Sequence, residues 1–380
     1  MITVKAFPHI NSGHTDEIFA GLWELHHGKR LRVRYGFRDP LGVSHAAHPV
    51  LYRNILSALV RDLSKNIARK ICFDLNDGPE IETACVRACD HYFKRGFDPR
   101  SLKRLDPHLR RKVLPYGLNY QCRSQHEKRN TLKRLIRFCA ADTPQRLRMR
   151  SMQQMVRNFA VRRLAKGTAA YAPSNDRSLL ISDLEAGPDV VVEPLVLYQV
   201  KIYDPESLAG RPVAEFKRLM DERANLVRAL KRAFGKQFIG GVLPTDYARK
   251  HYADCISTFS PERRSYLRLV RGCLIGVATT GLHDSAGWKL AEYFAGSKCI
   301  VSKPLKYVLP RPLVEGEHYL TFDSANECVR SCVRILDDSD LVHRMRRANY
   351  HYYRSQIRPP QKIWSCIQRT LACEDNLQHP

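Results

Sequence analysis

The chain has 380 residues, of which 44% are hydrophobic, so it is long enough for two domains of about 180 residues with buried cores. It carries 63 Lys and Arg against 38 Asp and Glu, a formal charge of +25, which indicates an anionic partner or surface. No run of 18 apolar residues is present, and this excludes a membrane-spanning helix.

The first 115 residues alternate between strand and helix patterns, which is typical of a parallel sheet covered by helices on both faces. We expect strands at 2–7, 31–37 and 70–75, shorter strands at 92–94 and 112–115, and helices at 16–27, 52–66 and 80–89. Thr15 can cap the first helix, and the turn-forming residues 76–79 end the strand before them.

Residues 121–166 interrupt this alternation with two predicted basic helices, at 131–140 and 144–166. The wider stretch 101–166 holds 18 Lys and Arg against three acidic residues, Asp106, Glu127 and Asp142, and so supplies +15 of the net charge. Such helices are often only solvated faces. The near absence of acidic residues favours a surface that binds nucleic acid, anionic lipid headgroups or an anionic acceptor.

After a linker at 167–194, which includes a short strand near Val190, the alternation restarts. We expect strands at 194–203, 238–243, 274–278 and 319–322, and helices at 213–234, 261–272, 341–353 and 363–371. Ser324 and Glu327 can form a capping box for a further helix that follows them. The predicted fold is α/β, with two Rossmann-like doubly wound domains and a cleft between them. The expected boundaries are 1–185, 186–355 and a C-terminal helix, 356–380, that packs back toward the first domain.

The stretch 274–302 is predicted to form a buried strand, a loop, a helix and another strand. Gly281 and Gly287 flank the loop, which holds His283, Asp284 and Ser285. Polar side chains at the carboxyl end of such a strand lie where open α/β sheets bind ligands. The amino terminus of the following helix attracts phosphate through its N–H groups and dipole.

The segment 281–302, with its Lys-Leu-x-Glu-Tyr core followed by Ile-Val-Ser, resembles the donor-binding motif of GT-B glycosyltransferases. It is most similar to bacterial glycosyltransferase family 1-like proteins that act on cell-surface glycans. Asp284 and Glu292 match the two acidic residues that this family places eight positions apart, with an aspartate where glutamate is common. Segments 312–322, 73–78 and 113–119 are similar to their family counterparts, so the likeness covers most of the chain outside 121–166.

The resemblance implies a nucleotide-sugar donor and a glycan or lipid-linked acceptor, and the side chains suit that chemistry. Glu292 can accept hydrogen bonds from ribose hydroxyls, while Lys289 and Lys201 can neutralise the leaving diphosphate. Phosphate oxygens are within the expected reach of His283, Ser285 and the N–H groups around Gly287. Since no convincing carboxylate pair for a divalent ion is present, we predict metal-independent transfer and no cofactor. Trp288, Tyr293 and Phe294 are expected to be core residues.

The predicted acceptor domain must supply a base if the enzyme inverts the sugar's configuration. The candidates are His9, His14 and Asp16 after the first strand, and Asp74 and Asp77 after a later one. We prefer His14, because it follows Gly13 in a polar loop, with Asp16 as the second choice. Asp16 and Asp77 could equally be a helix-start residue and a turn former. A retaining enzyme would need no base in this role.

The twelve cysteines are scattered through apolar segments without a CxxC pair, which argues against a zinc site. Residues 1–8 are typical of a first core strand rather than of an export signal, so we expect reduced cysteines in a cytoplasmic protein. The basic helices would place it peripherally at the inner face of the membrane. The alternatives are a nucleic-acid-binding protein, although 121–166 has few aromatic residues to stack on bases, and a non-catalytic GT-B homologue that binds sugars.

Overall fold

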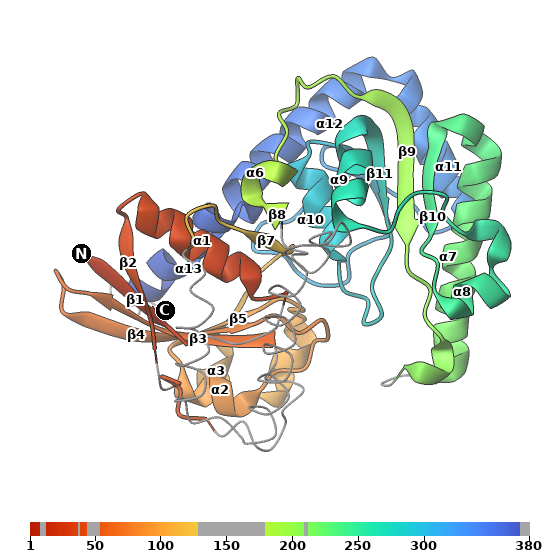
Figure 1. Ribbon diagram of the computed structural model, residues 1–380. Helices are drawn as coiled ribbons and strands as arrows, with labels where there is room; N and C mark the ends of the chain where they lie inside the picture. Colours follow the sequence, from red (N-terminus) through yellow and green to blue (C-terminus); the bar gives the residue numbers. More distant parts are fainter. Residues whose placement is uncertain (8–12, 37–38, 44–53, 128–178, 209–211, 373–380) are drawn as a thin grey trace, which may run out of the picture. The chain divides into compact units, whose positions relative to one another are not determined.

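The computed structural model describes residues 1–7, 13–36, 39–43, 54–127, 179–208 and 212–372. The chain divides into two compact units. Unit 1 comprises residues 1–181, 307–310 and 355–380, and unit 2 comprises residues 182–306 and 311–354. Both are α/β units with largely parallel sheets, so the predicted fold class is confirmed (Figure 1). Within the described ranges, no helix is long and apolar enough to cross a membrane.

Unit 1 is built on a six-stranded sheet with the strand order β2-β1-β3-β4-β5-β6 and a separate two-stranded ribbon, β7-β8. Its strands are β1 (Ile2–Ala6), β2 (Leu31–Tyr35), β3 (Ile55–Asp62), β4 (Ile67–Asp74), β5 (His91–Lys94), β6 (Val113–Pro115), β7 (Cys122–Arg123) and β8 (Leu179–Leu180). Its helices are α1 (Asp16–His27), α2 (Thr83–Ala88), α3 (Pro107–Arg110) and α13 (Pro359–Leu371).

Side chains that alternate along these strands enter two cores. Leu56, Ala58 and Val60 of β3 pack with α1 and α13, whereas Ile55 packs with Cys72 and the residues of α2 and α3. Helices therefore cover both faces of the sheet (Figure 1). β3 runs antiparallel to β1 and β4, and the other five strands share one direction, so the carboxyl ends of β1, β4, β5 and β6 lie at one edge.

Unit 2 is built on a wholly parallel five-stranded sheet with the order β10-β9-β11-β12-β13. Its strands are β9 (Glu193–Val200), β10 (Phe238–Val242), β11 (Cys273–Ala278), β12 (Cys299–Ser302) and β13 (Leu320–Thr321). Its helices are α6 (Ile181–Leu184), α7 (Val213–Phe234), α8 (Asp246–His251), α9 (Arg263–Gly272), α10 (Trp288–Ala295), α11 (Ala325–Asp337) and α12 (Ser339–Tyr352). Unit 2 also has short 3-10 turns at Pro205–Ser207, Gly235–Gln237 and Ala253–Cys255, and unit 1 has one at Pro99–Arg104. A π-helical turn, Tyr353–Ile357, follows α12.

The two faces of this sheet are covered by different helices. Ile275 and Val277 of β11 pack in one core with residues of α7, α11 and α12. Gly276 between them faces α10, where a Cβ atom at this position would lie 2.6 Å from the Tyr293 ring. The glycine therefore lets α10 approach the sheet closely. The capping box of Ser324 and Glu327 at the start of α11 is present as predicted.

Two predictions about the type of an element were wrong. Residues 52–66 were expected to form a helix, but Ile55–Asp62 is strand β3, paired with β4 along its whole length. Its short apolar run fits a strand buried on both faces, and Asn66 takes the positive φ of 53° that the hairpin turn requires. Val190 lies in a turn rather than in a short strand. The two helices predicted at 131–140 and 144–166 lie outside the described residues.

Candidate functional site

In unit 2 the strand order reverses between β9 and β11. The chain runs from β9 to β10 on one side and then crosses to β11 on the other side of β9. The loops that follow β9 and β11 therefore leave the sheet in different directions, which opens a ligand position at the carboxyl ends of these two strands. Lys201 follows β9, and the loop 279–287 follows β11.

Arg223 of α7 fastens these two loops together. Its Nη1 donates to the backbone oxygen of Lys201 and its Nη2 to that of Thr280, both at 2.9 Å. The side chain is buried, and burial lowers the pKa of its guanidinium. Arg223 was not predicted as a site residue, because one arginine in a long helix with several basic residues does not stand out from the exposed ones.

The loop after β11 is closed by its own backbone. The N–H of Gly281 donates to the oxygen of Ser285 at 2.7 Å, and the N–H of Asp284 donates to the oxygen of Gly281 at 3.2 Å. Asp284 has a positive φ of 57°, and its Oδ2 accepts from Lys306 Nζ at 2.7 Å. Ser285 is buried and His283 is half-buried. The loop is therefore a compact turn in which the Asp284 carboxylate is ion-paired.

Gly287 is the N-cap of α10, and the first turns of this helix carry Lys289 and Glu292. Glu292 is 1% exposed, and its Oε1 lies 2.5 Å from Nη2 of Arg263 on α9. Its second oxygen, Oε2, is buried and has no hydrogen-bond partner within the described part of the chain. A buried carboxylate oxygen without a donor is costly, so this oxygen is suited to a ligand hydroxyl.

Lys289 lies beside this carboxylate, with its Nζ 5.5 Å from the centre of the Tyr266 ring. Burial lowers the pKa of the Lys289 ammonium to about 7; Glu292 opposes this shift, and Arg223 and Arg263 add to it. Lys289 therefore lies near two further cations, Arg223 and Arg263, and one carboxylate, Glu292. This local excess of positive charge favours an anion at the amino terminus of α10.

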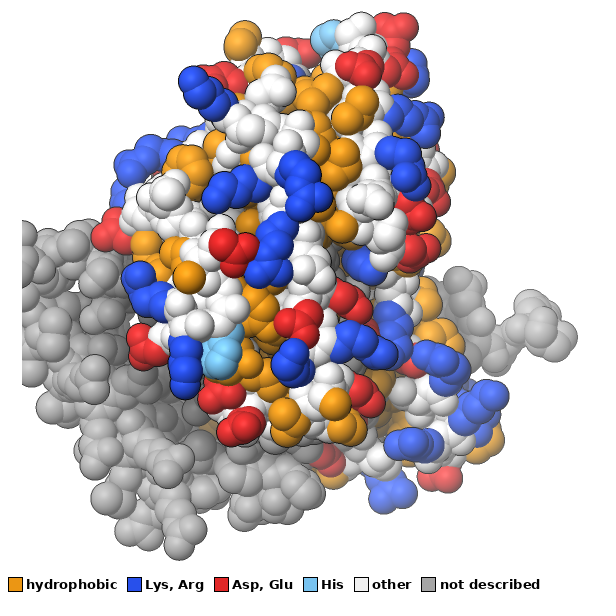
Figure 2. Space-filling model, turned by 90° about the vertical axis from the view of Figure 1, so that its right-hand side faces the viewer, with side chains coloured by type: hydrophobic (Ala, Val, Ile, Leu, Met, Phe, Trp, Pro, Cys, Tyr) orange, Lys and Arg blue, Asp and Glu red, His pale blue; other side chains and the backbone are white. Residues whose placement is uncertain are grey.

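Some exposed cations elsewhere in unit 2 are paired with carboxylates. Figure 2 shows Lys and Arg side chains interspersed with Asp and Glu on one face of the molecule. Lys217 pairs with Asp221 at 2.9 Å, and Arg228 pairs with Asp254 at 2.6 Å. Such pairs leave little net charge at the surface, in contrast to the carboxyl edge of the sheet.

In unit 1 the base candidates His14, Asp16, Asp74 and Asp77 lie at the carboxyl edge of the parallel strands. His14 lies half-buried in the turn before α1, where burial and then Arg95 lower the pKa of its imidazole to about 4. Asp16 begins α1, and its Oδ2 accepts from Gln121 Nε2 at 3.5 Å. Asp77 forms an ion pair with Arg95, and His9 lies outside the described residues.

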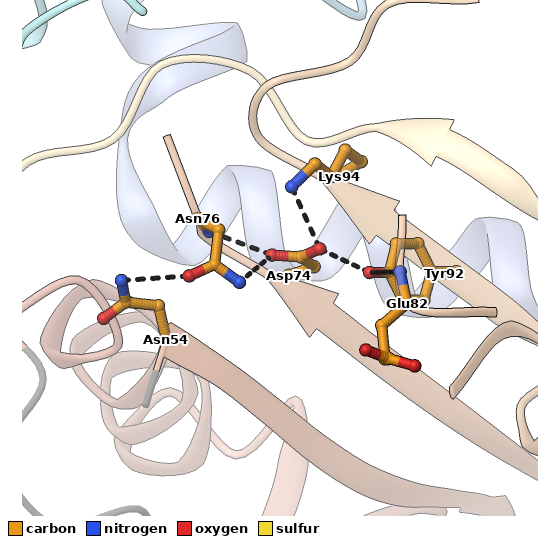
Figure 3. A network of polar contacts seen from close by, with 6 residues as sticks. All are labelled: Asn54, Asp74, Asn76, Glu82, Tyr92 and Lys94. Carbon is orange, nitrogen blue, oxygen red and sulfur yellow. Dashed lines mark hydrogen bonds and ion pairs between the residues drawn. The ribbon is translucent and has the colours of Figure 1, made fainter. Parts of the chain in front are cut away.

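Asp74 is enclosed in a network that connects β3, β4, β5 and the start of α2 (Figure 3). Its Oδ2 accepts from Lys94 Nζ at 3.0 Å and from the Tyr92 hydroxyl. Its Oδ1 accepts from the backbone N–H and the side-chain amide of Asn76 at 2.9 and 2.8 Å. Both oxygens are occupied, which makes Asp74 a structural group rather than a proton acceptor.

Three buried cations in unit 1 each contact a carboxylate: Lys94 contacts Asp74, Arg95 contacts Asp77, and Lys362 contacts Glu17. The carboxyl edge of this sheet is thus balanced in charge. Among the described residues, no group of three His, Cys, Asp or Glu side chains is arranged to hold a metal ion.

No protein-family profile and no curated protein matches the chain. Solved structures that resemble it include the pneumococcal O-GlcNAc transferase GtfA in complex with UDP and GlcNAc (9% identity, 97% of this chain and 98% of that chain, TM-score 0.37). Anabaena Alr3699/HepE in complex with UDP and glucose has 11% identity, coverage of 93% and 88%, and a TM-score of 0.36. A putative UDP-N-acetylglucosamine 2-epimerase from Listeria monocytogenes has 10% identity, coverage of 76% and 75%, and a TM-score of 0.31.

Proposed function

We propose that the chain is a GT-B glycosyltransferase that moves a sugar from a nucleotide-sugar donor to a cell-surface glycan or lipid-linked acceptor. The observation that carries this proposal is the buried Oε2 of Glu292, which lacks a hydrogen-bond partner among the described residues and lies beside an excess of cations. A nucleotide diphosphate offers both complements, since its ribose carries hydroxyl donors and its diphosphate carries negative charge.

The roles follow from these positions. Glu292 accepts a hydrogen bond from a ribose hydroxyl, and Lys289 together with the amino terminus of α10 binds the diphosphate. As the sugar–phosphate bond breaks, negative charge develops on the leaving diphosphate, and Lys289 stabilises it without a metal ion. Lys201 is exposed at the end of β9, from which its ammonium can reach the same diphosphate. Asp284 acts through its ion pair with Lys306, which fixes the loop.

On the acceptor side we keep His14 as the candidate base and Asp16 as the second. A pKa of about 4 leaves the His14 imidazole neutral at pH 7, so it is in the form that accepts a proton, although it is a weak base. Asp74 is not favoured as the base, because both of its carboxylate oxygens accept hydrogen bonds. Asp77 is not favoured either, because it is ion-paired with Arg95.

A thermal-shift panel of UDP-, GDP-, CMP- and dTDP-sugars tests the donor assignment. A ligand at 100 times its Kd stabilises the folded chain by about 2.7 kcal/mol, so one nucleotide should raise the unfolding temperature selectively. Glu292→Ala removes the carboxylate that accepts the hydrogen bond from the ribose. It should weaken the binding of that nucleotide at least tenfold, by roughly 1.4 kcal/mol or more. No shift with any of the four classes would refute the proposal.

The basic segment 121–166 is proposed to dock the enzyme on anionic lipid at the inner face of the membrane, where each Lys or Arg contributes about 1 kcal/mol. Flotation with vesicles that contain phosphatidylglycerol should recover the protein, and vesicles of phosphatidylcholine alone should not. Recovery that does not depend on anionic lipid would exclude this docking. Binding to RNA or DNA that persists at moderate salt would favour a nucleic-acid partner instead.

A further inference from the structure

Arg263, which the sequence analysis did not single out, connects two helices on the same face of the unit 2 sheet. It is the first residue of α9, and its guanidinium is 20% exposed. Its Nη2 lies 2.5 Å from Glu292 Oε1 on α10. Its Cζ lies 5.7 Å from the centre of the Tyr266 ring, the same ring that Lys289 Nζ approaches to 5.5 Å.

We propose that Arg263 is a positioning residue of the donor site, which fixes the Glu292 carboxylate for the ribose and keeps Lys289 ready for the diphosphate. This inference rests on the function proposed above, and it assigns a role to a residue outside the donor motif. Arg263 acts through Glu292 and Lys289 rather than on the reacting atoms.

The first part of this role follows from the geometry of the ion pair. A charge-assisted hydrogen bond at 2.5 Å holds Oε1 of Glu292 in one place, and the rigid carboxylate then fixes where Oε2 lies. Oε2 is the oxygen that has no hydrogen-bond partner among the described residues. Without Arg263 the carboxylate would lose its ion partner in a buried position and could rotate away from the ligand.

The second part is electrostatic. Lys289 lies near the Glu292 carboxylate and near two further cations, Arg223 and Arg263. Its pKa is lowered to about 7, mainly by burial; Glu292 opposes this shift and the two arginines add to it. The Lys289 ammonium therefore loses its proton near neutral pH in the free protein. A bound diphosphate supplies negative charge, so binding draws a proton onto Lys289 and becomes weaker as the pH rises through the pKa of the free form.

The chain offers a matched control in Arg264. It is the next residue of α9, carries the same charge, and is exposed to solvent. Arg263→Gln and Arg264→Gln therefore remove one cation each from the same helical turn, and only the first touches Glu292. Arg263→Lys restores the charge without the planar guanidinium that fixes a carboxylate.

The main test is calorimetric binding of three nucleoside diphosphates, UDP, GDP and dTDP, and of the monophosphate CMP to the full chain between pH 6 and 9. Arg263→Gln should lower the affinity for the nucleotide that wild type binds by tenfold or more. It should also move the pH at which affinity falls to a higher value, because Lys289 loses a neighbouring cation. Arg263→Lys should keep the wild-type pH midpoint while binding more weakly than wild type, and Arg264→Gln should match wild type in both respects.

A second readout needs no nucleotide. Reductive ¹³C-methylation of the lysines allows the Lys289 signal to be titrated by NMR, with Lys289→Arg to assign it. The midpoint should lie near pH 7 in wild type and in Arg264→Gln, and higher in Arg263→Gln.

The two readouts separate the possible failures. If wild type binds none of the nucleotides, the proposed function fails, and with it the role of Arg263 in a donor site. If wild type binds a nucleotide but Arg263→Gln matches Arg264→Gln in affinity and in both pH midpoints, the function stands and the role of Arg263 is overturned. A merely structural role would lower affinity without moving either midpoint, and that result would also contradict the inference.

Discussion

At the scale of single residues, Asp74 shows that a carboxylate at the end of a strand can be structural. It is 1% exposed and accepts four hydrogen bonds, from Tyr92, Lys94 and two N–H groups of Asn76. Lys94 is 0% exposed, so the ion pair at 3.0 Å has no contact with solvent. A buried pair of this kind stabilises the native state little in total, yet breaking it leaves a buried charge without its partner.

We therefore expect Asp74→Asn to lower the free energy of unfolding by roughly 3–5 kcal/mol, because Lys94 stays buried without a carboxylate. Urea unfolding of the two forms measures the difference. Asp106→Asn is the control, since Asp106 lies 3.8 Å from Arg87 with both side chains largely exposed, and it should change stability by about 1 kcal/mol or less. Equal stability of the two variants would show that the network in Figure 3 is not the source of the effect.

The proposed donor site could be predicted at this scale because three of its residues lie within six positions of the sequence. Gly287, Lys289 and Glu292 lie on one short helix after a buried strand, and the structure places them at the carboxyl edge of the unit 2 sheet. Arg223 and Arg263 reach the same place from two other helices. Nothing in the sequence near either arginine distinguishes it from its exposed neighbours, so only the folded arrangement reveals them.

At the scale of elements, regular periodicity predicted most helices and strands. Helices α1 and α7 begin and end where the sequence indicated, since each has an apolar stripe along its length. The prediction failed at β3, where the run Ile55–Val60 is buried on both faces and carries no period that separates a strand from a helix. Pairing with β1 and β4 decides its structure, and such partners are distant in sequence.

The start of α13 was also misjudged, for a local reason. The last helix was expected to begin at residue 363, but it begins at Pro359, and Pro359 and Pro360 form its first turn. Proline suits that position, because the first N–H groups of a helix have no partner within the helix. In β3 and α13 the apolar residues were correctly expected to be buried. The backbone conformation was not predicted, because it depends on strand pairing in β3 and on the helix start in α13.

At the scale of the whole molecule, the C-terminal segment belongs to unit 1, although the residues directly before it belong to unit 2. After α12 of unit 2, residues 355–380 belong again to unit 1, where Ile363, Cys366 and Ile367 of α13 enter the core formed with α1. The two helices approach closely at Gly21, where a Cβ atom would lie 2.6 Å from the backbone oxygen of Pro359. Unit 1 is therefore completed by residues from both ends of the sequence.

The contact between these ends includes a buried ion pair of Glu17 on α1 with Lys362 on α13. Lys362 Nζ also donates to the backbone oxygen of Leu118 at 2.5 Å and lies 4.3 Å from the centre of the Tyr116 ring. Burial raises the pKa of Glu17 to about 7, and Lys362 opposes this rise. Because the folded pKa lies above that of the unfolded chain, Glu17 contributes stability that is complete below about pH 4.5 and is lost as the pH rises through about 7.

Lys362→Met should deepen this pH dependence. Without the ammonium, the folded-state pKa of Glu17 rises further, so the variant loses more stability than wild type as the pH increases. We expect a deficit of roughly 3–5 kcal/mol at pH 9 and a clearly smaller one at pH 5, measured by urea unfolding. Arg369→Met, at an exposed position of α13, should show a small difference that is the same at both pH values. Adding Glu17→Gln to Lys362→Met should remove the pH-dependent part, and a deficit that stays constant from pH 5 to pH 9 would mean that Lys362 stabilises unit 1 by packing alone.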